Sequence, residues 1–447
     1  MRTTALSVVF QRVAMIACAA LLAACSAGRG PAPVNPARPA EAQTQPSMAP
    51  AQAPKPPGQT ASQPAAGGSS SASQIPAPGA ATAAGTATAL GPAIALPALP
   101  GWTQDDLLDL DRAIRRQCAM RNPPGPWPVL CAEFSTLPTG SGTAGSGPTG
   151  SASVVSAAAL RAWLERRFVA RELGEAGSSP RGLVTGYYEP LIRGSRQRRS
   201  ASQVPIYAPP RDLITIELAS IEPRLSGMRL RGRLQGDRVV PYADRAEIER
   251  SGLPAADVLL WADDPVDAFF LEIQGSGRVQ LPDGQVVRIG YANQNGHPFR
   301  AIGRTLIDRG LMASQDVSAP GIRSWLRANP AQARELMHTN PSQVFFRELP
   351  APADAQAGPP GAMGVPLTAL RSIAVDRRHV SLGSLVWLTT REPMRNAPME
   401  RLMVAQDVGG AIVGAVRADV FWGFGEVAGD VAGRMKADGR MWLLEPR

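Results

Sequence analysis

Histidine, cysteine and lysine are scarce in this chain of 447 residues, and what is missing narrows the possible functions. The three histidines, His297, His338 and His379, lie far apart, and no spacing of Cys, His or Asp is typical of a metal site. We therefore expect structural histidines, no bound metal and no other cofactor. The chain also lacks a Gly-x-Ser-x-Gly motif and a glycine-rich phosphate-binding loop, which disfavours serine hydrolases and nucleotide-dependent enzymes.

The N-terminus has the pattern of a bacterial lipoprotein signal. Arg2 gives a positive start, residues 13–24 are mainly apolar, and Cys25 follows small residues. The apolar run is too short for a permanent membrane-spanning helix. We expect residues 1–24 to be removed and Cys25 to be acylated; the alternative is an ordinary signal beside a chance cysteine. Ser26 in place of an aspartate favours the outer membrane, with the protein facing the periplasm.

Two segments have too little apolar side chain to fold alone. Residues 25–96 are rich in Ala, Pro, Gly and Ser, so they cannot bury enough surface to offset the entropy of ordering. They predict a disordered tether, and residues 139–153 predict a surface loop. Cys118 and Cys131 remain as a pair in an exported domain, where disulfides persist. They flank a Pro-rich turn, and we expect them to be bonded.

The charge is positive but spread out. Only Lys55 and Lys436 are lysines among 46 basic residues, and the net charge is +9. Such a charge can indicate nucleic acid, but export argues against that partner. The one cluster, residues 193–199, is typical of a solvated loop. An anionic cell-wall polymer fits better.

Helical spacing of apolar residues predicts helices at residues 103–120 and 156–172. Further helices are predicted between residues 298 and 337, interrupted at Pro320 and Pro330.

The rest of the folded sequence predicts short strands. A strand is expected at residues 183–188 and a hairpin over residues 279–289, around a Pro-Asp-Gly turn. The later strands are expected at residues 344–347, 372–375, 384–388, 402–405, 411–413, 416–421 and 441–444. Many short strands separated by turns indicate a β-barrel.

Asp407 and Asp419 are the carboxylates whose surroundings favour chemistry. A diglycine closely follows Asp407, and Asp419 precedes Val420, Phe421 and Trp422. Among apolar side chains a carboxyl group loses hydration, which raises its pKa and keeps a proton available for an acid step. Both aspartates could equally bind backbone amides in turns, and the local sequence leaves this open.

The segments around Asp376, Asp407 and Asp419 resemble the three-aspartate domain that ends membrane-bound lytic murein transglycosylases of the A family. Upstream segments resemble the same family, and the resemblance covers roughly residues 97 to 447. Those segments are residues 184–190, 204–207, 261–270, 274–277, 290–296 and 340–346.

This resemblance implies a mainly β fold with peripheral helices. The fold would be a double-psi β-barrel with an inserted smaller β-domain and a groove between them. Residues 97–190 would begin the main domain, residues 191–340 would form the inserted domain, and residues 341–447 would complete the barrel.

The resemblance also implies the activity, that of a lytic exotransglycosylase. It would cleave the β-1,4 bond between N-acetylmuramic acid and N-acetylglucosamine in peptidoglycan glycan strands and leave a 1,6-anhydromuramic end. Asp419 would be the single catalytic acid and base, supported by Asp407 and Asp376. One carboxylate suffices because the muramic 6-hydroxyl, rather than water, closes onto C1. Cell-wall synthases or scaffold proteins would be its partners.

Seven residues are expected to line the groove, because tyrosine faces and amide groups suit sugar surfaces. They are Thr185, Gly186, Tyr187, Gln274, Ser276, Tyr291 and Asn295. Each also has a structural interpretation. Phe421 and Trp422 fit a core better, and Glu189 and Glu272 are the carboxylates to consider if one aspartate does not suffice.

Two other functions stay open on the sequence. One is a hydrolase that uses Asp407 and Asp419 as an acid–base pair, as most glycosidases use two carboxylates. The other is a peptidoglycan-binding lipoprotein without catalysis.

Overall fold

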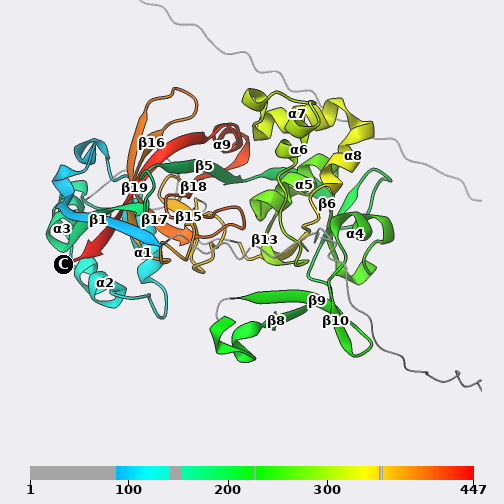
Figure 1. Ribbon diagram of the computed structural model, residues 1–447, viewed down its shortest axis with the longest axis horizontal. Coiled ribbons are helices and arrows are strands. Elements are labelled where there is room, and N and C mark those ends of the chain that lie inside the picture. Colours follow the sequence, from blue (N-terminus) through cyan, green and yellow to red (C-terminus); the bar gives the residue numbers. More distant parts are fainter. Residues whose placement is uncertain (1–86, 141–153, 226–227, 352–353, 355) are drawn as a thin grey trace, which may run out of the picture. The chain divides into compact units, whose positions relative to one another are not determined.

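The computed structural model describes residues 87–140, 154–225, 228–351, 354 and 356–447 (Figure 1). The chain divides into two units, Met1–Ala80 and Ala81–Arg447, and every described residue belongs to the second. The predicted signal and Cys25 lie outside the described residues, as do most of the tether and of the 139–153 loop. Within the described part, no helix combines the length and apolar character needed to cross a membrane.

Six strands close into a barrel because β19 pairs with β16 along one part and with β5 along another. Two neighbouring pairs, β15–β17 and β18–β5, are parallel, and the others are antiparallel. Buried aliphatic side chains fill this barrel. Its strands, in order, are β5 (Gly182–Glu189), β18 (Ala418–Phe424), β15 (Ser372–Val375), β17 (Pro398–Asp407), β16 (Leu385–Arg391) and β19 (Lys436–Pro446). The expected mainly β fold is confirmed.

A second sheet of six strands follows β5 in the chain, and in Figure 1 β5 runs from the barrel strands toward its strand β6. Its order is β14 (Val344–Leu349), β13 (Val286–Gln294), β12 (Ser276–Gln280), β6 (Leu191–Ser195), β11 (Val258–Ala262) and β7 (Val204–Tyr207). The predicted hairpin is confirmed as β12 and β13. Because β14 pairs with β13, this sheet extends past residue 340, where the sequence placed the end of the inserted domain.

Smaller elements surround the second sheet. A separate three-stranded sheet has the order β10 (Arg238–Val240), β9 (Arg229–Gln235) and β8 (Ile214–Glu217). The helices are α4 (Arg245–Ser251), α5 (Pro265–Gln274), α6 (Ile302–Asp308), α7 (Ala319–Ala328) and α8 (Pro330–His338). Pro320 and Pro330 lie in the first turns of α7 and α8, where proline's missing N–H costs nothing, so they begin helices.

The N-terminal helices pack on the barrel around buried tryptophans. They are α1 (Leu110–Cys118), α2 (Trp127–Ser135) and α3 (Ala157–Arg167). The prediction of one helix over residues 103–120 was wrong at its start, because Leu107 and Asp109 have positive φ angles. Asp105 instead forms a fully buried ion pair with Arg371. A disulfide joins Cys118 to Cys131, and so α1 to α2.

Three other local predictions were wrong. The helix predicted over residues 156–172 ends at Arg167, because the chain continues as β4 (Phe168–Glu175), which pairs with β19. β1 (Thr88–Ala95) lies in the predicted tether and pairs with β4. The strand predicted at residues 411–413 is a turn. The first two errors come from strand partners far away in the sequence.

Candidate active site

Asp419 lies at the second position of β18, between two barrel strands. It is opposite Thr185 of the parallel strand β5 and opposite Ala374 of the antiparallel strand β15. The Thr185 hydroxyl donates a hydrogen bond of 2.6 Å to Oδ1 of Asp419. Among the described residues none donates to Oδ2, and this atom is not sealed from solvent. One carboxyl oxygen is therefore held in place while the other is free.

The surroundings of Asp419 favour its protonated form. Burial raises the pKa of its carboxyl group to about 6, against opposing effects from the Thr185 hydrogen bond and the Arg417 guanidinium. The negative charge of Asp407 raises this pKa further. The group therefore keeps its proton in mildly acidic solution, where an ordinary aspartate is ionised, and releases it at modest cost.

Asp407 ends β17, and both of its carboxyl oxygens have partners. The Tyr187 hydroxyl donates to Oδ2 at 2.9 Å, and the backbone N–H of Ala362 donates to Oδ1 at 2.8 Å. Burial raises the pKa of Asp407 in spite of these bonds. The ring of Tyr187 lies 5.3 Å from that of Phe421, so the tyrosine is fixed at both ends. Burial, with Asp407 next, raises the pKa of Tyr187 well above its ordinary value, which keeps it a donor.

Gly186 lies between Thr185 and Tyr187 and has a packing role. A Cβ atom at this position would lie 2.7 Å from the indole nitrogen of Trp422 and 3.0 Å from the Cα atom of Ala432. Glycine therefore lets Trp422 pack against β5. The two neighbouring side chains of β5 then point to the other face, toward the aspartates.

Asp376 is the third aspartate of the motif and has a different environment. It accepts hydrogen bonds from the Arg378 side chain and from the backbone N–H of Gly414. Burial alone would raise its pKa, but Arg378 and the backbone donors lower it to about 2. Asp376 is thus a permanently charged group that fixes a turn. It is not among the groups that shift the pKa of Asp419.

The other predicted groove residues are spread over α5, β12 and β13. Gln274 ends α5, and its amide oxygen accepts the backbone N–H of Tyr188 in β5 at 3.0 Å, which joins the helix to the barrel strand. Ser276 is buried at the start of β12. Tyr291 is 44% exposed in β13, so its ring is available at the surface.

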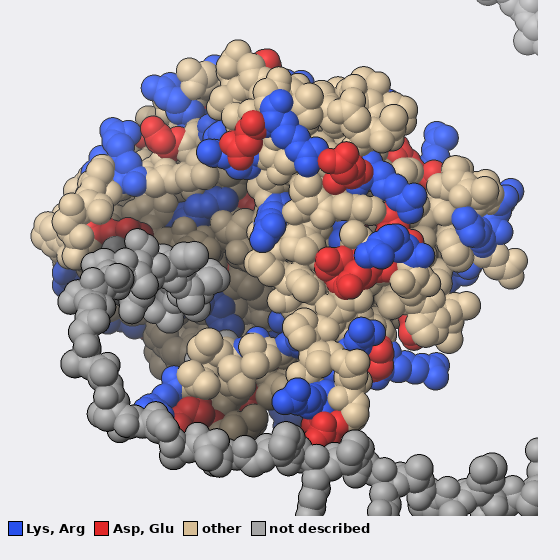
Figure 2. All heavy atoms as spheres, turned by 45° about the vertical axis from the view of Figure 1, so that its right-hand side comes forward, with Lys and Arg blue, Asp and Glu red and all other residues tan. Residues whose placement is uncertain are grey.

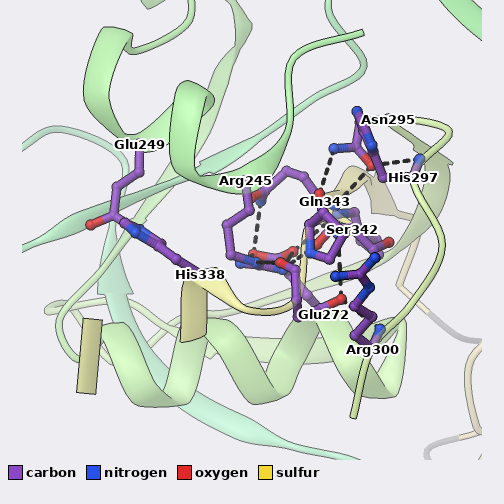
Figure 3. A network of polar contacts seen from close by, with 12 residues as sticks. Arg245, Glu249, Glu272, Asn295, His297, Arg300, His338, Ser342 and Gln343 are labelled. Atoms are coloured by element: carbon purple, nitrogen blue, oxygen red, sulfur yellow. Dashed lines mark hydrogen bonds and ion pairs between the residues drawn. The ribbon is translucent and has the colours of Figure 1, made fainter. Parts of the chain in front are cut away.

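Asn295, like Ser276, is a predicted groove residue that the structure buries. Its side chain is 1% exposed. The amide nitrogen donates to the carbonyl oxygens of Ala243 and Pro341, and the amide oxygen accepts the backbone N–H of Gln343 (Figure 3). Because its hydrogen-bonding groups are used by the backbone, Asn295 holds loops together.

Glu272 and Glu189, the two reserve carboxylates, are neutralised by arginines. Arg245 binds Glu272 through two nitrogens, at 3.1 and 2.8 Å, beside the Gln343 amide (Figure 3). Glu189 is 0% exposed and pairs with Arg278 at 2.9 Å and Arg288 at 3.2 Å. Both glutamates are committed to these ion pairs.

Each histidine has a polar partner of its own. His297 contacts the carbonyl oxygen of Tyr242 at 2.7 Å, His338 contacts Glu249, and His379 contacts the Thr88 hydroxyl at 2.8 Å. Within the residues that the structure describes, no group of three or more His, Cys, Asp or Glu side chains could hold a metal ion.

Sequence reasoning missed Arg417 beside Asp419, and Arg278 and Phe424 beside Glu189. Arg417 interacts with Asp419 electrostatically. The guanidinium of Arg278 lies over the ring of Phe424, 3.7 Å from its centroid. Alternation along β5 could have pointed to this cluster, because Thr185, Tyr187 and Glu189 share one face of the strand. Arg417 lies two residues before Asp419 and so had a local signal, whereas Arg278 comes from β12 and had none.

Comparison with known proteins places these residues in a family. Residues 183–347 match the MltA specific insert domain, and residues 371–445 match the 3D domain, which includes all three aspartates. A membrane-bound lytic murein transglycosylase A of Escherichia coli K12 is 36% identical over 268 residues, which cover 58% of this chain and 65% of that protein. That of Vibrio cholerae is 31% identical over 285 residues, 62% of this chain and 68% of that protein. The chain belongs to this family.

Solved structures of the family agree with the fold. MltA from Neisseria gonorrhoeae has a TM-score of 0.66 and 33% identity, and the match covers 81% of this chain and 95% of that one. E. coli MltA with bound chitohexaose has a TM-score of 0.59 and 27% identity, with 81% and 96% covered. The curated E. coli relative is matched over 65% of its length, less than two thirds.

Proposed function

We propose that this protein is a lytic transglycosylase of peptidoglycan, with Asp419 as its catalytic acid and base. The observation that carries the proposal is the carboxyl group of Asp419, whose pKa burial raises to about 6 and whose Oδ2 is free while Thr185 holds Oδ1. A general acid works best with a pKa near the working pH. The family's name describes the same reaction.

The reaction needs one carboxyl group that acts twice. Protonated Asp419 gives its proton to the glycosidic oxygen between N-acetylmuramic acid and N-acetylglucosamine as the C1–O bond breaks. The leaving sugar departs as an alcohol, and C1 gains oxocarbenium character. The Asp419 carboxylate then accepts the proton of the muramic 6-hydroxyl as its oxygen bonds to C1. A 1,6-anhydro ring forms, the acid is regenerated, and no water is consumed.

Asp407 supports the acid instead of acting as a second catalyst. Its two oxygens are committed to Tyr187 and to the backbone N–H of Ala362, so it is poorly placed to activate water or attack C1. Its charge raises the pKa of Asp419. Asp376 stabilises the turn that precedes β16.

The glycan strand would bind in a groove beside this pair, on a double-psi barrel. The two parallel pairs, β15–β17 and β18–β5, support that barrel type. Figure 2 shows one face of the molecule hollowed, with Lys and Arg side chains on the walls. Thr185, Tyr187, Gln274, Ser276 and Tyr291 are the groove residues that we retain.

We further propose that acylated Cys25 anchors the protein in the outer membrane, facing the periplasm. The curated relatives are named membrane-bound. A tether between anchor and enzyme would let the active site reach glycan strands, and cell-wall synthases or scaffold proteins are the partners that we expect there.

Mass spectrometry of digested glycan strands tests the proposal. Wild-type protein should release products with 1,6-anhydromuramic ends, one water lighter than hydrolysis products, and Asp419→Asn should release none. Reducing ends from the wild type would indicate a hydrolase that uses Asp407 and Asp419 as an acid–base pair. Binding without release of soluble products would indicate a lipoprotein that only binds peptidoglycan. The sizes of the early products separate cleavage from strand ends from cleavage within strands.

A further inference from the structure

Phe424 is an aromatic side chain on the same face of the barrel sheet as Asp419. The strand register places Asp419 opposite Thr185 and Phe421 opposite Tyr187; an irregularity in β18 after Phe421 then brings Phe424 opposite Glu189. Side chains of directly paired residues lie on the same face, and alternate residues of β5 share that face. From Thr185 to Glu189 the strand advances about 13 Å at ~3.3 Å per residue. Phe424 therefore lies on the same face as the catalytic carboxyl group, about 13 Å further along the strand.

The backbone presents this ring at the surface. Phe424 stands between Gly423 and Gly425, whose φ angles are 105° and 82°. Residues with a Cβ atom rarely adopt such angles, so the two glycines let the chain turn on both sides of the phenylalanine. The turn ends β18 and starts α9 (Gly425–Ala432), which leaves the side chain of Phe424 45% exposed.

One face of the ring is fixed by a charged network. The Arg278 guanidinium lies 3.7 Å from the ring centroid, and its Nε donates to buried Glu189 at 2.9 Å. Arg288 binds the other oxygen of Glu189. Nη2 of Arg278 is buried and has no hydrogen-bond partner in the described part of the chain. Stacking of the guanidinium on the Phe424 ring offsets the loss of its hydration. The guanidinium occupies one face of the ring, and Phe424 is nonetheless 45% exposed.

We propose that Phe424 is a platform on which a sugar ring of the glycan strand stacks, away from the bond that is cleaved. The inference rests on the proposed function and adds a substrate contact to the same site. A pyranose ring in β-1,4 linkage presents an apolar C–H face, which suits the negative face of an aromatic ring. Arg278 and Glu189 hold the ring in place before the substrate arrives, which reduces the ordering cost of binding.

Binding of chitohexaose to the full-length protein tests the platform. Phe424→Ala should weaken binding about 3- to 10-fold, the size of an aromatic contact. Phe424→Tyr keeps the ring and should bind like the wild type. Phe424→Leu keeps an apolar cover over Arg278 without a flat face, so it should bind like the alanine variant. Val427→Ala, at an 82% exposed position of α9, is the matched control and should have no effect.

Kinetics separate a platform from a structural role. On glycan strands, Phe424→Ala should raise KM and leave kcat and the pH profile set by Asp419 unchanged, because the ring lies far from the reacting atoms. A purely structural role predicts that Phe424→Leu restores binding and that thermal stability follows affinity, and either result would overturn the platform. If Phe424→Ala binds chitohexaose as tightly as the wild type does, the platform is overturned but the proposed function is not. Failure of the wild type both to bind chitohexaose and to release anhydro products overturns the proposed function with it.

Discussion

Two sets of carboxyl groups beside β5 are held in opposite ways. Along the middle of the strand, Asp419 and Asp407 accept hydrogen bonds from the Thr185 and Tyr187 hydroxyls and from a backbone N–H. At the end of the strand, Glu189 pairs with two arginines, and Glu272 in helix α5 pairs with a third. The two aspartates thus have no direct ion pair, whereas both glutamates are paired with arginines.

The difference separates chemistry from structure. A buried carboxylate that forms ion pairs with arginines has its negative charge compensated, and it joins elements of the fold. A buried carboxyl group beside hydroxyls lacks that compensation, so burial raises its pKa, as it does for Asp419 and Asp407. Burying such a group costs stability when it is ionised, and the same penalty raises its pKa into the range that suits a general acid.

The largest expected effect is loss of stability at Glu189. Glu189→Gln leaves Arg278 and Arg288 buried without a counter-charge, and we expect the free energy of unfolding to fall by about 3–5 kcal/mol. Urea unfolding measures this change. Glu348→Gln removes an exposed ion pair with Arg196 and should cost less than about 1 kcal/mol. An equal loss of unfolding free energy in the two variants would show that the buried ion pairs of Glu189 contribute no more stability than an exposed one.

The next effect is a shift of the pH profile when the partners of Asp419 are changed. Activity needs protonated Asp419, so kcat/KM should fall about tenfold per pH unit above about pH 6. Thr185→Val removes a hydrogen bond that lowers the pKa, so the alkaline limb should move to higher pH. Asp407→Asn removes a charge that raises the pKa, so the limb should move to lower pH.

The readout is the position of the limb, not the rate at its maximum, because both substitutions can also slow the reaction. Val427→Ala provides a control whose limb should not move. Shifts in the same direction for both variants would contradict the assignment of Asp419 as the titrating acid.

Sequence patterns predicted the parts of this protein that depend on neighbouring residues. Alternation and turn signals predicted strands close to β15, β17 and β18, and the apolar residues after Asp419 indicated a desolvated carboxyl group. Family resemblance then singled out Asp419 among three aspartates. The disulfide partners could be chosen because only two cysteines remain after the signal segment and Cys25.

What the sequence could not predict depends on distant partners. Asp105 starts no helix because Arg371, 266 residues away, binds its carboxylate. β1 is ordered by pairing with β4, although its own composition resembles the tether. Asn295 was expected at a sugar surface, but the backbone groups of Ala243, Pro341 and Gln343 surround it. Amide and carboxylate side chains look alike in sequence whether they bind substrate or backbone.

The smallest expected effect is a pH-dependent change in the stability of two Asp→Asn variants, one at a charged aspartate and one at the proposed acid. Asp376 has a pKa of about 2 in the folded protein, below its ordinary 3.8. Its charge therefore stabilises the fold above pH 4, and this contribution is lost as the pH falls toward 2. Asp376→Asn should be less stable than the wild type at pH 6, on the order of 1 kcal/mol after solvent screening, and the two should converge in acid.

Asp419→Asn should show the opposite sign. The pKa of Asp419 is raised from 3.8 to about 6, so the folded state favours the protonated form, and that advantage disappears as the pH rises through 6. The variant should match the wild type near pH 4 and be more stable at pH 8, although it is inactive. Thermal unfolding at pH 2, 4, 6 and 8 measures both variants. If Asp419→Asn were less stable at pH 8, its carboxylate would be paired like Glu189, and the contrast between the two sets of carboxyl groups would be lost.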